Sequence, residues 1–171
     1  MTTLQYLAGY PAHIQQQVSQ LLEQGKLAQH LTKRYPHLHD IRTDKALYRY
    51  TQDIKNTFLR KSQPVTKVVY DDKLTLSHQA LGLHSYVARQ QGNKIKAKNE
   101  IRISAKLKVV PEAFLRMLVV HELAHLKEKE HNKAFYKLCV YMEPDYHQLE
   151  FDLRLYLTLI ETKLNPYQVI S

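Results

Sequence analysis

The chain has 171 residues, which is long enough for one domain with its own core. Apolar residues make up 44% of it, which excludes a disordered chain, and no apolar run approaches the roughly 18 residues of a transmembrane helix. The N-terminus lacks the features of a secretory signal, and the single cysteine, Cys139, cannot form an intrachain disulfide. We therefore expect a cytoplasmic protein that does not bind a membrane.

The net charge of +9 is unevenly distributed along the chain. Residues 1–111 contain 18 Lys/Arg and 7 Asp/Glu, whereas residues 112–171 contain 7 Lys/Arg and 9 Asp/Glu. A basic surface of this kind suits an anionic partner, but a solvated surface that only favours solubility explains it equally well.

Residues 1–171 are expected to form a single domain, with a helical part over 1–62 and a core with C-terminal helices over 63–171. Gly25 is a natural end for the first helix, and Pro36 closes the second. The predicted helices cover residues 11–24, residues 27–35 and the stretch from Asp44, as N-cap, to Phe58.

A small sheet is predicted for the middle of the chain, between helical parts, which gives an α+β fold class. Gly92-Asn93 is a good hairpin turn between two of the expected strands. The strands are predicted at residues 65–70, 74–76, 85–90 and 94–105.

The last of these strands alternates between apolar and polar residues, so one of its faces is expected to be strongly cationic. The residues expected on its outer face are Lys94, Lys96, Lys98, Glu100, Arg102 and Ser104. Those expected on its inner face are Ile95, Ala97, Ile101, Ile103 and Ala105.

Three helices are predicted after the sheet. Pro111 suits the first position of a helix whose run from Phe114 to Leu126 is apolar on nearly every side, so this helix should be central and buried. A second helix is expected from Asn132 to just before Pro144, and a third begins at Asp145.

The central helix carries a pattern typical of zinc hydrolases. His121 and His125 are four residues apart, so they lie on one face of the helix and can converge on one ion. Glu122 is placed to act on water as a general base without binding the ion. A carboxylate in an otherwise apolar helix needs such a partner, because burying it unpaired is costly.

A third ligand is expected at His131, six residues after His125. That is the spacing of the third ligand in the extended metzincin motif, but Glu128 stands where metzincins have a glycine. We therefore expect the chain to turn there through a nearby residue in the left-handed conformation. Glu128 and Glu130 remain alternative ligands.

These residues predict one Zn²⁺ per chain and hydrolysis without a covalent intermediate. The ion would acidify water and polarise the substrate oxygen, and Glu122 would accept the proton as the water attacks. The same parts could act on a carbonyl or a phosphoryl group.

Other polar residues near the motif are weaker candidates. Tyr136 and Tyr141 could stabilise an oxyanion but are expected in the core, His147 could support a ligand, and Cys139 is expected to pack. The histidines expected at the surface or in loops are His13, His30, His37, His39, His78 and His84.

The segments MLVVHELAHLKEKEHNKAFY, NKIKAKNEIRIS and LLEQGKLAQHLTKRYP resemble the YgjP-like metallopeptidase-domain proteins of bacteria. The resemblance implies a zincin-like domain with a small, mostly antiparallel sheet beside the active-site helix and extra helices at the N-terminus. It also implies the zinc ligands His121, His125 and His131, and Glu122 as the catalytic residue. Many relatives carry Trp-Gly-Ser before the last strand, where this chain has Leu83-His84-Ser85.

Three functions fit these features. A zinc metallopeptidase is the first, with an extended peptide paired to the strand before the helix. The second, which the resemblance also implies, is a nucleoside triphosphate pyrophosphatase acting on UTP, with Lys96 and Arg102 binding the phosphates. A DNA-associated protease of the SprT type is the third, although motifs for binding nucleic acid are missing.

Overall fold

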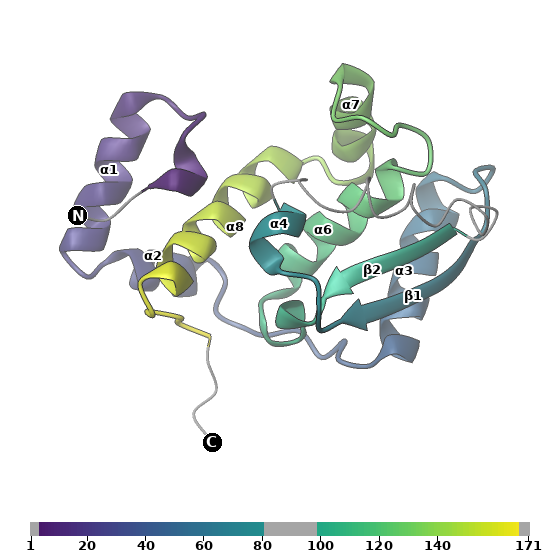
Figure 1. The fold of residues 1–171 in the computed structure, drawn as a ribbon, viewed down its shortest axis with the longest axis horizontal. Helices are drawn as coiled ribbons and strands as arrows, with labels where there is room; N and C mark the ends of the chain where they lie inside the picture. Colours follow the sequence, from purple (N-terminus) through teal and green to yellow (C-terminus); the bar gives the residue numbers. More distant parts are fainter. Residues whose placement is uncertain (1–3, 81–98, 168–171) are drawn as a thin grey trace.

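The computed structural model describes residues 4–80 and 99–167, which combine helices with one small sheet (Figure 1). Its helices are α1 (Ala12–Glu23), α2 (Leu27–Arg34), α3 (Asp44–Phe58), α4 (Leu76–Ala80), α6 (Glu112–Ala124), α7 (Lys133–Met142) and α8 (Tyr146–Glu161), with 3-10 turns η1 (Gln5–Leu7) and η3 (Ala105–Val109). The strands are β1 (Val65–Asp71) and β2 (Asn99–Ser104). This arrangement confirms the α+β class. Within the described ranges, no helix is long and apolar enough to cross a membrane.

Helix α6 is the centre of the core, as its sequence predicts. It contacts β2, α3, α7 and α8, so neighbours surround it on most sides (Figure 1). Pro111 is the N-cap of this helix and not its first residue. The residues of α6 with no exposed surface are Phe114, Leu115, Met117, Leu118, Val119, Val120, Leu123 and Ala124.

The two described strands run parallel, so the antiparallel sheet expected from the sequence is wrong for this pair. Residues 72–98 connect them, and a parallel pair needs a crossover of about a dozen residues or more. The expected hairpin at Gly92-Asn93 and the strand over 85–90 lie outside the described residues, as does the start of the strand over 94–105.

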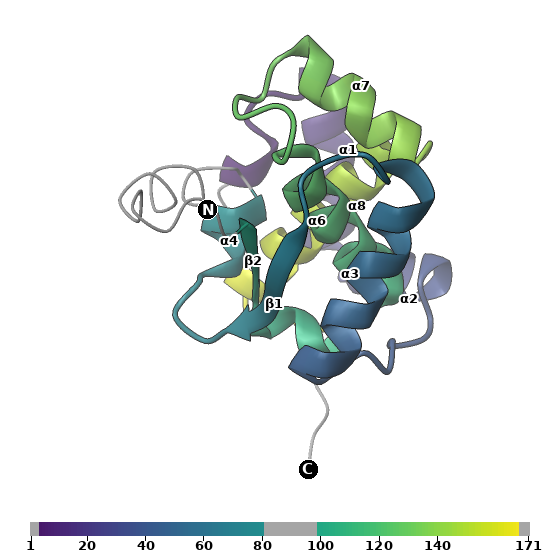
Figure 2. The ribbon, with the colours of Figure 1, turned by 90° about the vertical axis from the view of Figure 1, so that its right-hand side faces the viewer.

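Two details of the sheet region also differ from expectation. Residues 74–76 do not form a strand; they lead into α4, which contacts the edge of β2 away from β1 in both views (Figures 1 and 2). Ile101 and Ile103 face the core as predicted, but Ser104 is buried and not on the outer face. β2 ends at Ser104, and its amide is held by a side chain of α4, which removes it from solvent.

The helices before the sheet begin and end within two residues of their predicted bounds. Thr43 and not Asp44 is the N-cap of α3, because its side chain accepts a hydrogen bond from the Ala46 amide at 3.1 Å. Asp44 instead accepts from the Tyr70 amide at 2.9 Å, which joins α3 to β1. His39 was expected at the surface but is buried, with its Nε2 2.7 Å from the Leu107 carbonyl oxygen.

The 3-10 turn η1 packs on α8. The Tyr6 hydroxyl donates to Glu161 at 3.0 Å, and Arg154 donates to the Tyr6 carbonyl oxygen at 2.8 Å. Helix α2 also contacts α8, and Figure 1 shows η1, α1 and α2 gathered on that side of α8. The two ends of the described chain therefore stabilise each other.

A buried carboxylate anchors α2 to α8. Asp152 is 1% exposed and accepts hydrogen bonds from the Tyr35 hydroxyl and from Gln148 Nε2, the latter at 3.1 Å. Arg34 approaches the same carboxylate at 3.3 Å, but its side chain is 49% exposed. The hydrogen bonds to this buried carboxylate should therefore contribute more stability than the exposed ion pair.

The variant Asp152→Ala should lower the free energy of unfolding by about 2 kcal/mol, because it removes the buried acceptor of the partly buried Tyr35 hydroxyl and of Gln148. Removal of the exposed partner in Arg34→Ala should cost about 1 kcal/mol or less. Urea unfolding followed by circular dichroism measures both. Equal losses in the two variants would contradict the importance of the buried hydrogen bonds.

Candidate metal centre

Three imidazole rings converge at the end of α6. His121 lies in its last turn, His125 caps it, and His131 lies in the loop before α7. His131 Nε2 is 3.1 Å from His125 Nε2 and 3.2 Å from His121 Nε2. These three residues are the group of possible metal ligands that the described part of the chain contains.

The spacing of the three nitrogens fits a tetrahedral ion. A zinc–nitrogen bond of about 2.0–2.1 Å places two ligand atoms of a tetrahedral site about 3.3 Å apart. In the tautomers that bind a metal, the three facing nitrogens carry lone pairs, which repel one another at these distances unless a cation lies between them. The donor set therefore fits a divalent metal and leaves one coordination position for water or substrate.

The outer nitrogens of two of these rings are held by oxygen atoms. His125 Nδ1 lies 2.9 Å from the Glu128 carbonyl oxygen, which can only accept, so Nδ1 carries the proton and Nε2 the lone pair. His121 Nδ1 lies 2.9 Å from the Tyr146 hydroxyl oxygen. Such contacts orient the rings and set the tautomer that binds a metal.

Tyr146 and Cys139 form a buried pair behind His121. Burial raises the pKa of Tyr146 far above its ordinary value, so its hydroxyl keeps its proton. The hydroxyl oxygen can accept the Nδ1 proton of His121, and in that tautomer the Nε2 lone pair of His121 faces the other two rings. Burial also raises the pKa of the Cys139 thiol to about 12. Cys139 therefore packs, as predicted, and is no nucleophile at neutral pH.

The Phe135 ring packs against all three rings of the histidine cluster. Its ring centroid lies 4.9 Å from those of His121 and His131 and 4.7 Å from that of His125. Desolvation lowers the pKa of His131, which favours the neutral ring that a metal requires.

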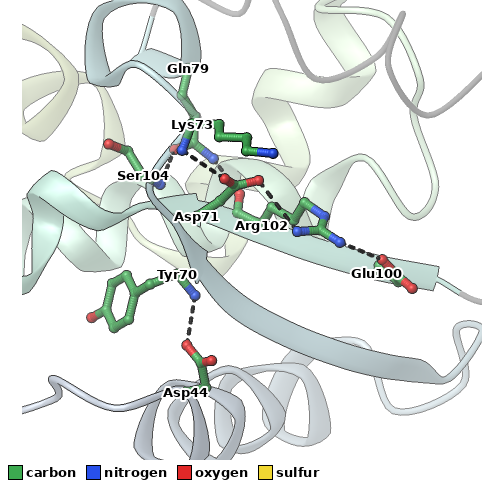
Figure 3. Close-up of polar contacts among 8 residues, drawn as sticks. All are labelled: Asp44, Tyr70, Asp71, Lys73, Gln79, Glu100, Arg102 and Ser104. Atoms are coloured by element: carbon green, nitrogen blue, oxygen red, sulfur yellow. Dashed lines mark hydrogen bonds and ion pairs between the residues drawn. The ribbon is translucent and has the colours of Figure 1, made fainter.

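Glu122 lies beside the cluster and is 1% exposed. Gln79 of α4, also 1% exposed, brings its Nε2 to 3.5 Å from Glu122 Oε2. The other hydrogen bonds of the Gln79 amide are to β2: Nε2 donates to the Arg102 carbonyl oxygen at 2.6 Å, and Oε1 accepts from the Ser104 amide at 2.8 Å (Figure 3). The carboxylate is thus connected through one side chain to the strand.

The turn between His125 and His131 contains no left-handed residue, contrary to expectation. Within residues 4–80 and 99–167, positive φ occurs at Gly25 and Lys163. The chain instead closes α6 with short-range bonds, such as that from the Lys127 amide to the Ala124 carbonyl oxygen at 3.1 Å. A glycine is therefore not required at position 128.

The two alternative ligands are not in the histidine cluster. Glu128 contributes its backbone carbonyl to His125, and its carboxylate lies 3.5 Å from Asn132 Nδ2. Glu130 is exposed in the same loop. Both carboxylates are thus outside the group of possible ligands.

Arg102 lies on the exposed face of β2, as predicted, but it is paired with acids. Its guanidinium contacts Asp71 at 3.3 Å and Glu100 at 3.4 Å, and its side chain is 46% exposed (Figure 3). Asp71 comes from β1, so the cationic face predicted from one strand is partly neutralised by its neighbour. Lys96 lies outside the described residues.

The weaker candidates have different positions. Tyr136 is partly buried with its ring centroid 6.5 Å from that of His131, whereas Tyr141 was expected in the core but is 60% exposed. His147 is exposed, contacts Glu150 at 3.6 Å and lies outside the histidine cluster.

Three residues that contact the centre are not identified by the sequence argument: Gln79, Phe135 and Tyr146. Phe135 and Tyr146 fall within the two helices predicted from Asn132 and Asp145, but the sequence gives them no role at the site, and residues 74–76, shortly before Gln79, were expected to be a strand. A single buried glutamine leaves no periodic pattern in the sequence, so its partners become apparent only in the three-dimensional structure.

The comparisons with known proteins identify the family of this chain. A family model described as the YgjP-like metallopeptidase domain matches residues 13–156, which include the three histidines and Glu122. A curated protein of Escherichia coli (strain K12) named UTP pyrophosphatase is 58% identical over 165 residues, which cover 96% of this chain and 99% of the relative. No solved structure matches the chain. The chain is therefore a metal-dependent hydrolase, and it belongs to the YgjP-like metallopeptidase-domain family.

Proposed function

We propose that this chain hydrolyses nucleoside triphosphates, UTP foremost, to the monophosphate and pyrophosphate at a zinc centre held by His121, His125 and His131. The observation that carries this proposal is the 58% identity to a UTP pyrophosphatase over nearly the full length of both chains. It favours the nucleotide function over the peptidase function that the helix motif alone suggests. A nucleotide substrate and one buried, reduced cysteine also suit the cytoplasmic location expected from the sequence.

The proposed mechanism assigns one task to each group. The ion, when bound, supplies Lewis acidity that polarises a phosphoryl oxygen and acidifies water. Glu122 accepts the proton of the attacking water. The water oxygen bonds to the α-phosphorus, the bond from that phosphorus to the bridging oxygen breaks, and its electron pair leaves with pyrophosphate.

The surroundings of Glu122 suit this role. Its carboxylate is almost entirely removed from solvent, and Gln79 limits its rotation from one side. His131 lies in an exposed loop, which gives a substrate access to the metal ligands from that side. Glu122 thus lies on the buried side of the centre, and the triphosphate enters from the exposed side, where His131 lies.

We assign the phosphate contacts to Lys96 and Arg102. The ion pairs of Arg102 with Asp71 and Glu100 are half exposed, and such pairs are worth little. A triphosphate offers stronger charge-assisted hydrogen bonds to a guanidinium than one exposed carboxylate does. Arg102 can therefore exchange its partners on substrate binding.

A metallopeptidase is the second candidate, because the family model is described as a metallopeptidase domain. The same three histidines and Glu122 would serve amide hydrolysis. Pyrophosphate release from UTP, CTP, ATP and GTP, measured beside cleavage of a peptide library, separates the two functions. Release selective for UTP supports the proposal, whereas peptide cleavage without release would overturn it.

The variant Glu122→Gln should lower the rate of pyrophosphate release about a thousandfold, because it removes the proton acceptor and keeps the shape of the side chain. The metal content of the variant, measured by mass spectrometry, should equal that of the wild type. A chelated wild-type sample gives the matching blank. Release that survives in Glu122→Gln at more than a tenth of the wild-type rate would contradict the role of Glu122.

Replacement of Tyr146 by Phe should weaken metal binding about tenfold, since His121 loses the oxygen that orients its ring. Competition with a chromogenic chelator measures this affinity for zinc, independently of activity. Tyr136→Phe is the matched control, because it removes a hydroxyl from a ring whose centroid lies 6.5 Å from that of His131. Equal affinities in the two variants would contradict the role of Tyr146.

The double variant Lys96→Ala/Arg102→Ala should raise the KM for UTP several-fold and change peptide cleavage little. Its control is Lys45→Ala/Arg49→Ala, which removes the same charge from exposed positions of α3. Steady-state kinetics at fixed ionic strength test both. A similar rise in KM in the two double variants would show a general charge effect and not phosphate contacts.

A further inference from the structure

The outer edge of β2 is occupied by the side chain of Gln79. β1 pairs with one edge of this strand, and α4 lies along the other (Figures 2 and 3). The Gln79 carboxamide donates to the Arg102 carbonyl oxygen and accepts from the Ser104 amide, at 2.6 and 2.8 Å. These are the bonds that an amide unit of a neighbouring strand would make, so the side chain imitates one residue of such a strand.

An extended peptide binds a sheet by pairing with such edge groups. Here the two groups lie beside the catalytic carboxylate, because Gln79 Nε2 also reaches Glu122 Oε2 at 3.5 Å. A peptide aligned on residues 102–104 would have to displace a side chain that is 1% exposed and hydrogen-bonded at both ends. A nucleoside triphosphate needs no backbone pairing and keeps its access to the ion.

We infer that Gln79 is a specificity-determining residue: it blocks the outer edge of β2 and so excludes extended peptides from a peptidase-like centre. This inference rests on the proposed function, because it explains how a site of the metallopeptidase type acts on nucleotides. Because Gln79 occupies both edge groups, a peptide cannot form two backbone hydrogen bonds there. The absence of these two bonds weakens peptide binding about tenfold or more.

The test compares two replacements that differ in volume. Gln79→Ala removes both the hydrogen bonds and the blocking side chain, whereas Gln79→Met removes the hydrogen bonds and keeps the length. Cleavage of a quenched-fluorescent extended peptide library and pyrophosphate release from UTP are measured for both variants, the wild type and the Glu122→Gln blank. Circular dichroism melting confirms that each variant is folded.

Gln79→Ala should cleave peptides at least about tenfold faster than the wild type, and Gln79→Met should show no gain. The inference would be overturned by equal gains in both variants or by no gain in a folded Gln79→Ala. It would also be overturned if the wild type cleaves peptides as fast as Gln79→Ala does. If the wild type fails to hydrolyse UTP, the proposed function fails, but the comparison of peptide rates still decides the role of Gln79.

A second measurement does not depend on a folded alanine variant. In the wild type the Ser104 amide should exchange its hydrogen slowly, because Gln79 accepts it, and addition of an excess of an extended peptide should leave that rate and its NMR shift unchanged. A shift or added protection at Ser104 on peptide addition would show that the edge is open to peptides and would overturn the inference.

Discussion

The cost of burying polar groups governs the structure around the candidate metal centre. Helix α6 is surrounded by the core, yet its last turns carry His121, Glu122 and His125. In such a place each polar atom needs a partner, because desolvation is not otherwise compensated. The neighbouring elements supply these partners: α8 gives Tyr146, α4 gives Gln79, and the following loop gives a carbonyl oxygen and His131. The site is therefore an assembly of contacts between elements more than a property of one helix.

The parallel pairing of β1 and β2 is part of this assembly. A hairpin would have returned the chain directly to its neighbour, but the crossover carries α4 to the far edge of β2. That position lets one glutamine bind the strand and approach the buried Glu122 carboxylate at the same time. The same geometry separates the half-exposed Arg102, which extends from the strand, from the buried backbone groups that Gln79 covers. The Arg102 guanidinium and the backbone groups that Gln79 covers thus lie on different sides of one short strand.

The sequence predicts the helices and the histidine cluster well because those features depend on local spacing. The bounds of α1 and α2 follow from apolar periodicity and from Gly25 and Pro36, and the buried α6 follows from its apolar run. Strand direction is different, because it depends on the whole connection and not on one turn signal. The buried positions of His39 and Gln79 also depend on partners distant in sequence, Leu107 and Ser104. Periodicity does not indicate such pairs, so the sequence argument placed His39 at the surface and overlooked Gln79.

The packing of η1 and α2 on α8 has a consequence for how the protein is made. Tyr6 is hydrogen-bonded to Glu161 and Arg154, and Tyr35 is hydrogen-bonded to Asp152. These contacts join residues more than a hundred positions apart in the sequence. During translation these segments leave the ribosome long before their partners exist, with apolar residues such as Leu7 and Leu31 still uncovered. Completion of the native state must therefore wait for the final helix, and the nascent chain is exposed to aggregation and to chaperones until then.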